Sequence, residues 1–147
     1  MAETLGMLCD KLTIVKLKQF HTEDADRLHS LDKQATDLQN EIDAYISDAV
    51  TGKISPDKLT FEANKVFKKE GNEIASVQGN IAEVFYKLAD INCRLWHEQE
   101  KVYDFEKVPV NEKDKVVKQL ALLNLERNNC IDAINKNFAS LLIRKTN

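Results

Sequence analysis

The chain has 147 residues, the size of one ordinary domain, so it can bury a core without metal ions or disulfides. Its 21 Lys and Arg residues are interspersed among 24 Asp and Glu residues, which leaves no basic footprint for nucleic acid or an anionic membrane. Cys9, Cys93 and Cys130 are far apart and odd in number, which argues against a disulfide framework or a zinc knuckle. The N-terminus lacks the pattern of a signal peptide and no apolar run is long enough to span a bilayer, so we expect a cytoplasmic protein.

The first predicted helical stretch covers residues 3–50. Helix-breaking residues are scarce, with four Gly and two Pro in the whole chain, and long helices are therefore expected. A kink or a tight hairpin is predicted within residues 21–28, because this run offers little to a core and the apolar register differs on its two sides. The next turn is predicted at VTGKISP, where Gly52 suits a left-handed helix end and Ser55 and Pro56 suit a helix start.

The second predicted stretch, 56–102, carries apolar residues three and four apart from Leu59 to Leu95, which indicates a helix-packing seam. Two alternatives stay open for it, one continuous helix or a break at Gly71. The third stretch, 112–143, follows the interruption at Pro109. The sequence therefore predicts a single all-α domain over residues 1–147, an antiparallel bundle of three to five long helices.

An internal similarity runs through this pattern. The segment KLTIVKLKQFH, residues 11–21, matches KLADINCRLWH, residues 87–97, at a constant offset of 76 residues. One interpretation is an internal repeat, with related units 3–50 and 79–143 packed about a pseudo-twofold axis. The alternative is coincidence between amphipathic helices.

Polar residues on the predicted apolar faces are the candidate ligand-binding residues. Lys16, Asn92 and Arg127 each fall inside an apolar arc, so we predict that they point inward and meet. Asn128 borders the arc of Arg127. Burying an unpaired charge costs several kcal/mol, so Lys16 and Arg127 need partners, and the candidates are Asp10, Glu41, Glu70, Asp90 and Asp132. Lys16, Asn92, Arg127, Asn128 and Asp10 either fix the helix register or line an inter-helix pocket for a small anionic or sugar-like ligand.

No catalytic or metal-binding motif is recognised. His21 and His97 are each followed three residues later by an acid, but this order is the reverse of that in carboxylate-bundle metal sites. We therefore expect no metal and no cofactor, with Phe20 and Trp96 in the core and the imidazoles at its edge. A phosphate-binding glycine loop and a nucleophile elbow are both missing from the sequence, so an enzyme is not expected.

Two segments carry a family resemblance. TLGMLCDKLTIVKLKQFH and LNLERNNCIDAIN resemble an uncharacterised family of small all-helical bacterial proteins with an LGxLxDKLxIV start and an LNxxRNxxID helix. The resemblance implies an all-helical fold and genes often located near those of glycosyltransferases or sugar-nucleotide enzymes, but no activity. The chain departs from the family pattern in having Lys16 where Asn is expected and Cys9 ahead of the Asp. The corresponding positions are Asp10, Lys11, Lys16, Arg127, Asn128 and Asp132.

We therefore expect a non-catalytic helical interaction or assembly protein. Helices of this length present more apolar surface than a few of them can hide from water, which favours a homo-oligomer. No nucleic acid or membrane partner is expected. The alternative is a protein that binds a small anion or nucleotide-sugar, or an enzyme of glycan metabolism, that uses the inter-helix polar pocket.

Overall fold

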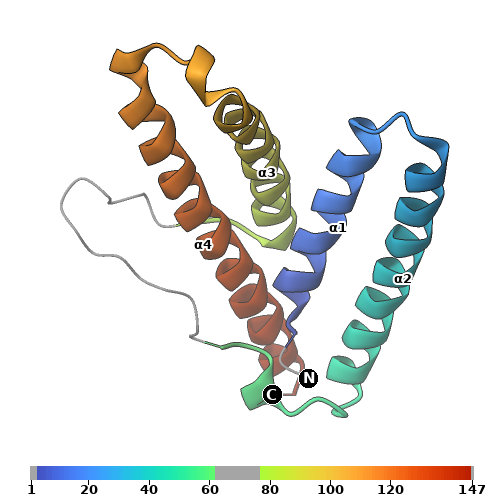
Figure 1. The fold of residues 1–147 in the computed structure, drawn as a ribbon. Coiled ribbons are helices and arrows are strands. Elements are labelled where there is room, and N and C mark those ends of the chain that lie inside the picture. The colour runs from blue at the N-terminus through green and yellow to red at the C-terminus, as the bar shows by residue number, and fades with distance from the viewer. Residues whose placement is uncertain (1–2, 62–76, 147) are drawn as a thin grey trace.

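The computed structural model describes residues 3–61 and 77–146, and over these residues the chain is helical with no strand. This confirms the predicted all-α bundle of helices (Figure 1). No helix of the described part is long and apolar enough to cross a membrane. The four α-helices are α1 (Leu5–Phe20), α2 (Ala25–Val50), α3 (Ile81–Tyr103) and α4 (Lys113–Thr146). Short 3-10 turns lie at Pro56–Lys58, Phe105–Lys107 and Val110–Glu112.

The helices α1 and α2 form an antiparallel hairpin. Helix α1 ends at Phe20, and Asp24 caps α2 by accepting hydrogen bonds from the backbone N–H groups of Asp26 and Arg27. The break predicted within residues 21–28 is therefore confirmed, and its cause is an acidic N-cap that satisfies the first free amides of α2. The turn predicted after α2 is also confirmed, with Gly52 in the left-handed region at φ +81°.

The helices α3 and α4 form the second hairpin. The prediction of helix throughout residues 56–102 is wrong at 59–61 and 77–80, which are not helical, and at Pro56–Lys58, which is a 3-10 turn. Gly79 has φ +124°, and the Asn80 side chain accepts a hydrogen bond from the Glu83 N–H at 2.9 Å, so α3 starts at Ile81. The candidate break at Gly71 lies outside the described residues.

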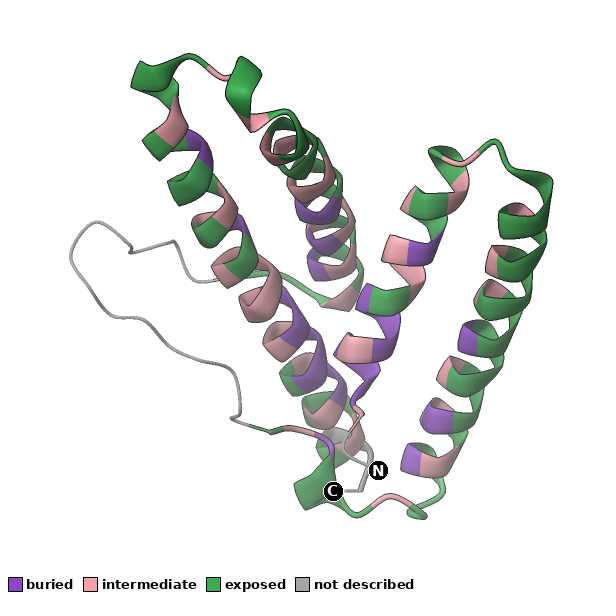
Figure 2. Ribbon diagram, viewed as in Figure 1, coloured by how far each residue is buried: buried purple, intermediate pink, exposed green. Residues whose placement is uncertain are grey.

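Helix α1 joins the two hairpins. It packs against α2 on one side and against both α3 and α4 on the other, while α3 and α4 pack along each other. The hairpins converge where the chain termini lie and diverge toward the opposite end (Figure 1). Figure 2 shows that the buried residues of α1 and α4 gather toward the convergent end.

The core consists mainly of one row of buried apolar residues on each of the four α-helices described. In α3 the predicted seam is confirmed over Val84, Leu88 and Ile91, which are almost fully buried. Each of the other helices adds apolar residues at helical spacing, which are Leu5, Leu8 and Val15 from α1, Leu38, Tyr45 and Ala49 from α2, and Leu123, Cys130, Ile131, Ile134 and Phe138 from α4.

Candidate functional site

A buried carboxylate lies where α1, α3 and α4 meet. Asp10 of α1 is only 5% exposed, and Arg127 of α4 pairs with it through two hydrogen bonds. Arg127 Nε donates to Asp10 Oδ1 at 2.8 Å, and Arg127 Nη2 donates to Asp10 Oδ2 at 2.5 Å. A bidentate pair of this kind fixes both side chains in orientation and compensates the charge of the carboxylate.

Asn92 of α3 completes this arrangement. It is 1% exposed, and its Nδ2 donates to Asp10 Oδ1 at 3.0 Å and to Thr13 Oγ1 at 2.7 Å. Thr13 in turn donates to the Asp10 carbonyl oxygen at 2.7 Å. Because both acceptors face the same amide nitrogen, they determine which way the Asn92 amide points. Asp10, Thr13, Asn92 and Arg127, here called the Asp10 cluster, therefore tie three helices together.

The electrostatics of the Asp10 cluster favour the charged form of Arg127. The hydrogen bond to Asp10 raises the pKa of Arg127 above its usual value, burial opposes this, and the negative charge of Asp10 adds to it. Burial raises the pKa of the Cys9 thiol to about 11, and the charge of Asp10 contributes. Burial likewise raises the pKa of Cys130 to about 11. Both thiols are therefore protonated at neutral pH and are poor nucleophiles.

A second polar contact ties the start of α1 to α4. Asn135 Oδ1 accepts a hydrogen bond from the Gly6 N–H at 2.7 Å, and its Nδ2 donates to Thr4 Oγ1 at 3.0 Å. Thr4 and Asn135 are both buried. A Cβ atom on Gly6 would lie 2.4 Å from the Ile131 carbonyl oxygen, so only glycine allows the backbones to approach this closely.

The sequence prediction for the five candidate residues is right in part. Asp10, Asn92 and Arg127 do meet, whereas Asn128 is half-buried on α4 and takes no part in the hydrogen bonds of the Asp10 cluster. The prediction that Lys16 points inward is wrong, because Lys16 is exposed. Its position is about three helical turns after Leu5, on the same side of α1, but the hairpins have diverged by that point. One face of α1 is thus core at its start and surface at its end.

Sequence reasoning missed Thr13 and the contact of Thr4 and Gly6 with Asn135. The spacing of Thr13 and of Asn135 from inward-facing residues could have indicated both. Thr13 follows Asp10 by three residues, and Asn135 follows the buried Ile131 by four, so each lies on a face that was already predicted to be inward. Both Thr13 and Asn135 are polar residues that lie one helical turn from a residue predicted to face inward.

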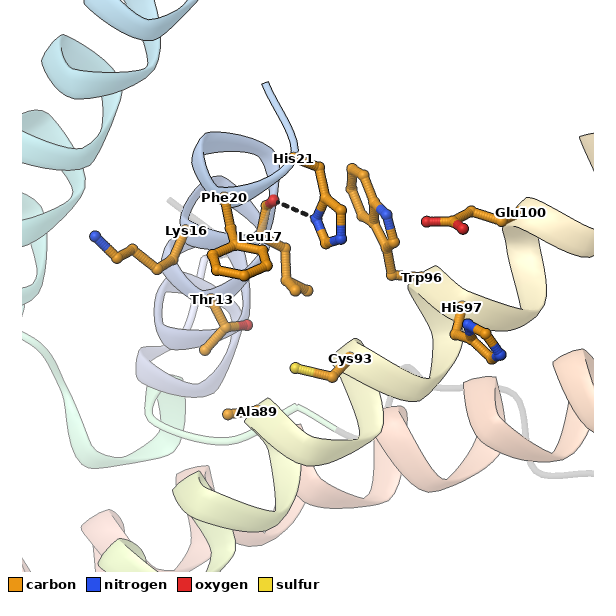
Figure 3. Close-up of a pocket in the computed structure, with 10 residues that line it drawn as sticks. All are labelled: Thr13, Lys16, Leu17, Phe20, His21, Ala89, Cys93, Trp96, His97 and Glu100. Carbon is orange, nitrogen blue, oxygen red and sulfur yellow. Dashed lines mark hydrogen bonds between the residues drawn. The ribbon is translucent and has the colours of Figure 1, made fainter. Parts of the chain in front are cut away.

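The far end of α1 meets α3 through aromatic rings (Figure 3). The rings of His21 and Trp96 are stacked, with centroids 4.7 Å apart and an interplanar angle of 19°. His21 Nδ1 lies 2.9 Å from the Leu17 carbonyl oxygen, which can only accept, so this nitrogen carries a proton. Phe20 packs edge-on against His21 but is 85% exposed, so the prediction that it lies in the core is wrong. The cause is again the divergence of the hairpins.

A hollow of about 580 Å³ lies between α1 and α3, from Thr13 at one end to the stacked rings at the other. We call it the α1–α3 hollow (Figure 3). A smaller hollow of about 430 Å³ lies between α1 and α2, and the two share Thr13 and Lys16. The α1–α3 hollow is lined by Thr13, Lys16, Leu17, Phe20, His21, Ala89, Cys93, Trp96, His97 and Glu100.

The residues that the structure describes contain no group of three or more His, Cys, Asp or Glu side chains placed to hold a metal ion. Comparison of the chain with protein-family models, curated proteins and solved structures finds no match.

Proposed function

We propose that this chain is a non-catalytic helical interaction protein that assembles with a second copy of itself. The observation that carries the proposal is the opposite charge on the exposed sides of α2 and α4, the second helices of the two hairpins (Figure 1). Among the exposed side chains that the structure describes, α2 has five acidic and two basic residues, whereas α4 has three basic residues and one acidic residue. Charges of opposite sign on two faces of one molecule favour association of two copies.

A twofold dimer pairs the acidic face of α2 and the basic face of α4 in both copies. In such a dimer α2 of each copy faces α4 of the other, so one favourable pairing is made twice. Asp37 and Glu41 are exposed one turn apart on α2, and Lys115 and Lys118 are exposed on adjacent turns of α4. These four side chains are free to reach a partner without disturbing the core.

The state of the buried polar groups also supports an interaction role. The charges of Asp10 and Arg127 compensate each other, and Asn92 hydrogen-bonds within the same cluster. The thiols of Cys9 and Cys130 have a pKa of about 11. The strongest buried polar groups of the chain thus serve to hold helices in place, which fits a scaffold better than a catalyst.

The test is a charge exchange followed by light scattering. The parent protein is expected to be a dimer at low salt and to dissociate as salt is raised, because salt screens exposed charges. The double variants Asp37→Lys with Glu41→Lys, and Lys115→Glu with Lys118→Glu, are each expected to be monomeric alone. Mixed in equal amounts, they are expected to form a heterodimer, since each then offers the other complementary faces.

Asp90→Lys provides the control, because this exposed residue lies on α3, which carries neither face. This variant is expected to give the same mass as the parent in light scattering. A monomeric parent at low salt, or charge variants that dimerise alone as the parent does, would contradict the proposal.

The proposal extends to the internal repeat and the compartment. Residues 11–20 lie in α1, with His21 as its C-cap, and residues 87–97 lie in α3. Each segment belongs to the first helix of a hairpin, which supports related units at 3–50 and 79–143. Three free cysteines suit the reducing conditions of a cytoplasmic location. Membership of the small all-helical bacterial family fits the Asp10 cluster, because two of its residues, Asp10 and Arg127, stand at motif positions.

A further inference from the structure

The α1–α3 hollow has the dimensions of a ligand site. Its volume of about 580 Å³ lies within the range of roughly 300–1,000 Å³ that is usual for small-molecule pockets. Its ends are set by contacts between α1 and α3, the Thr13 hydrogen bond to Asn92 at one end and the stacked rings of His21 and Trp96 at the other. The hollow is therefore bounded at both ends by contacts between α1 and α3.

The lining of the hollow favours an apolar ligand. Leu17, Phe20, Ala89, Cys93 and Trp96 form most of its walls. Two of its polar side chains are already engaged, since Thr13 bonds within the Asp10 cluster and His21 bonds to the Leu17 carbonyl. A sugar buried here would leave many of its hydroxyl groups without partners, which is costly, whereas a hydrocarbon chain would not.

A cation stands at the edge of the hollow. Lys16 borders both the α1–α3 and the α1–α2 hollow, and among the described residues it makes no ion pair. Figure 3 shows its side chain directed away from Ala89, Cys93 and Trp96, so the ammonium group reaches the hollow by rotation of its flexible four-carbon stem. The Glu100 carboxylate disfavours an anion at the Trp96 end, so an anionic group is favoured at the Lys16 end.

We propose that the α1–α3 hollow binds a single-chain anionic amphiphile, with its hydrocarbon chain between α1 and α3 and its headgroup on Lys16. This site is separate from the outer faces of α2 and α4 and does not depend on self-association. Apolar walls supply the affinity for the chain, and the ammonium group selects a headgroup that is a carboxylate or a phosphate ester.

Trp96 reports on binding directly, because it is the single tryptophan of the sequence and lines the hollow. Dodecyl phosphate, kept below its micelle concentration, is the probe. We expect it to shift the Trp96 emission and to raise the melting temperature. Decyl phosphate is expected to bind about 15-fold more weakly, since each buried methylene is worth about fourfold in affinity. Inorganic phosphate alone should give no response.

Matched variants separate the headgroup from the chain. Lys16→Met is expected to weaken decyl phosphate binding about fivefold and to leave the binding of neutral decanol unchanged. Lys18→Met is the control, because Lys18 is exposed on α1 and lines neither hollow. Ala89→Leu fills the hollow and is expected to reduce the binding of every chain, whereas Ala82→Leu, on the exposed side of α3, should not.

Three outcomes would overturn the assignment. The first is the absence of any response of Trp96 and of the melting temperature to dodecyl phosphate. The second is a response to vesicles of anionic lipid but not to the free amphiphile, which would indicate binding to a membrane surface. The third is an emission that changes on dilution of the protein and not with the probe, which would place a second copy in the hollow. The charge-reversed variants on α2 and α4 are expected to bind the probe as the parent does, so failure of the dimer leaves this test intact.

Discussion

Asp10 and Gly6 of α1 act between helices. Asp10 takes hydrogen bonds from Arg127 and Asn92, on two other helices, and Gly6 donates its backbone N–H to Asn135. A buried carboxylate is costly unless it is paired and fully hydrogen-bonded, and Asp10 meets both conditions. At this scale Asp10 and Gly6 specify where α1 crosses α3 and α4.

Replacement of Gly6 by alanine tests the closest of these contacts. The added Cβ would lie 2.4 Å from the Ile131 carbonyl oxygen and 2.9 Å from Asn135 Oδ1, and backbone on a packed helix cannot move away at low cost. We expect Gly6→Ala to lower the free energy of unfolding by about 3 kcal/mol, measured by urea denaturation.

Gly52→Ala serves as the comparison. Gly52 has no atom within 4 Å of an added Cβ, but its φ of +81° disfavours other residues by about 1 kcal/mol. If Gly6→Ala costs no more than Gly52→Ala, the close approach of α1 to α4 is not what requires glycine at position 6.

At the scale of the element, capping side chains decide where α2 and α3 begin. Asp24 Oδ1 accepts from the N–H groups of Asp26 at 2.9 Å and Arg27 at 3.2 Å, and Asn80 does the same for Glu83 in α3. These caps satisfy amides that have no partner within the helix. They make α1 and α2 two helices joined by a short turn and not one long helix.

Asp24→Ala is expected to lower the free energy of unfolding by about 1 kcal/mol, because both amides then lose their partner in the first turn of α2. The measurement is urea denaturation followed by far-UV circular dichroism. Glu23→Ala is the matched control, since Glu23 is an exposed acid next to the cap and is expected to change the stability by less than about 0.5 kcal/mol. Equal effects of the two variants would mean that the negative charge, and not the cap, stabilises the helix start.

Helix type, the hairpin at 21–24 and the seam of α3 could be predicted from sequence, because each depends on local spacing or on a cap. The inward position of Asn92 and Arg127 could also be predicted, and a charge inside an apolar arc needs a partner, but the sequence did not single out Asp10 among five candidate acids. The exposure of Lys16 and Phe20 could not, because it depends on the angle between two hairpins and not on the periodicity of α1. Periodicity gives the face of a helix but not how far along the helix that face stays covered.

At the scale of the whole molecule, the two hairpins are joined at two places of different character. The convergent end holds the Asp10 cluster, the Gly6 contact and most of the buried apolar residues of α1. The divergent end holds the stack of His21 on Trp96, both outside the fully buried core. Since stability comes mainly from buried contacts, we expect the convergent end to determine global unfolding and the divergent end to open locally.

Arg127→Met and His21→Ala test this division. Arg127→Met leaves Asp10 buried without its cation, and we expect a loss of about 2 to 3 kcal/mol in the free energy of unfolding, below the value for a fully buried pair because the Arg127 side chain is 31% exposed. His21→Ala removes only a stacked ring, so we expect a loss within about 0.5 kcal/mol together with a red shift of Trp96 emission. His29→Ala, at an exposed site on α2, controls for the loss of an imidazole and should change neither quantity. If His21→Ala destabilises the protein as much as Arg127→Met, the ring stack is part of the global folding unit and the divergent end does not open independently.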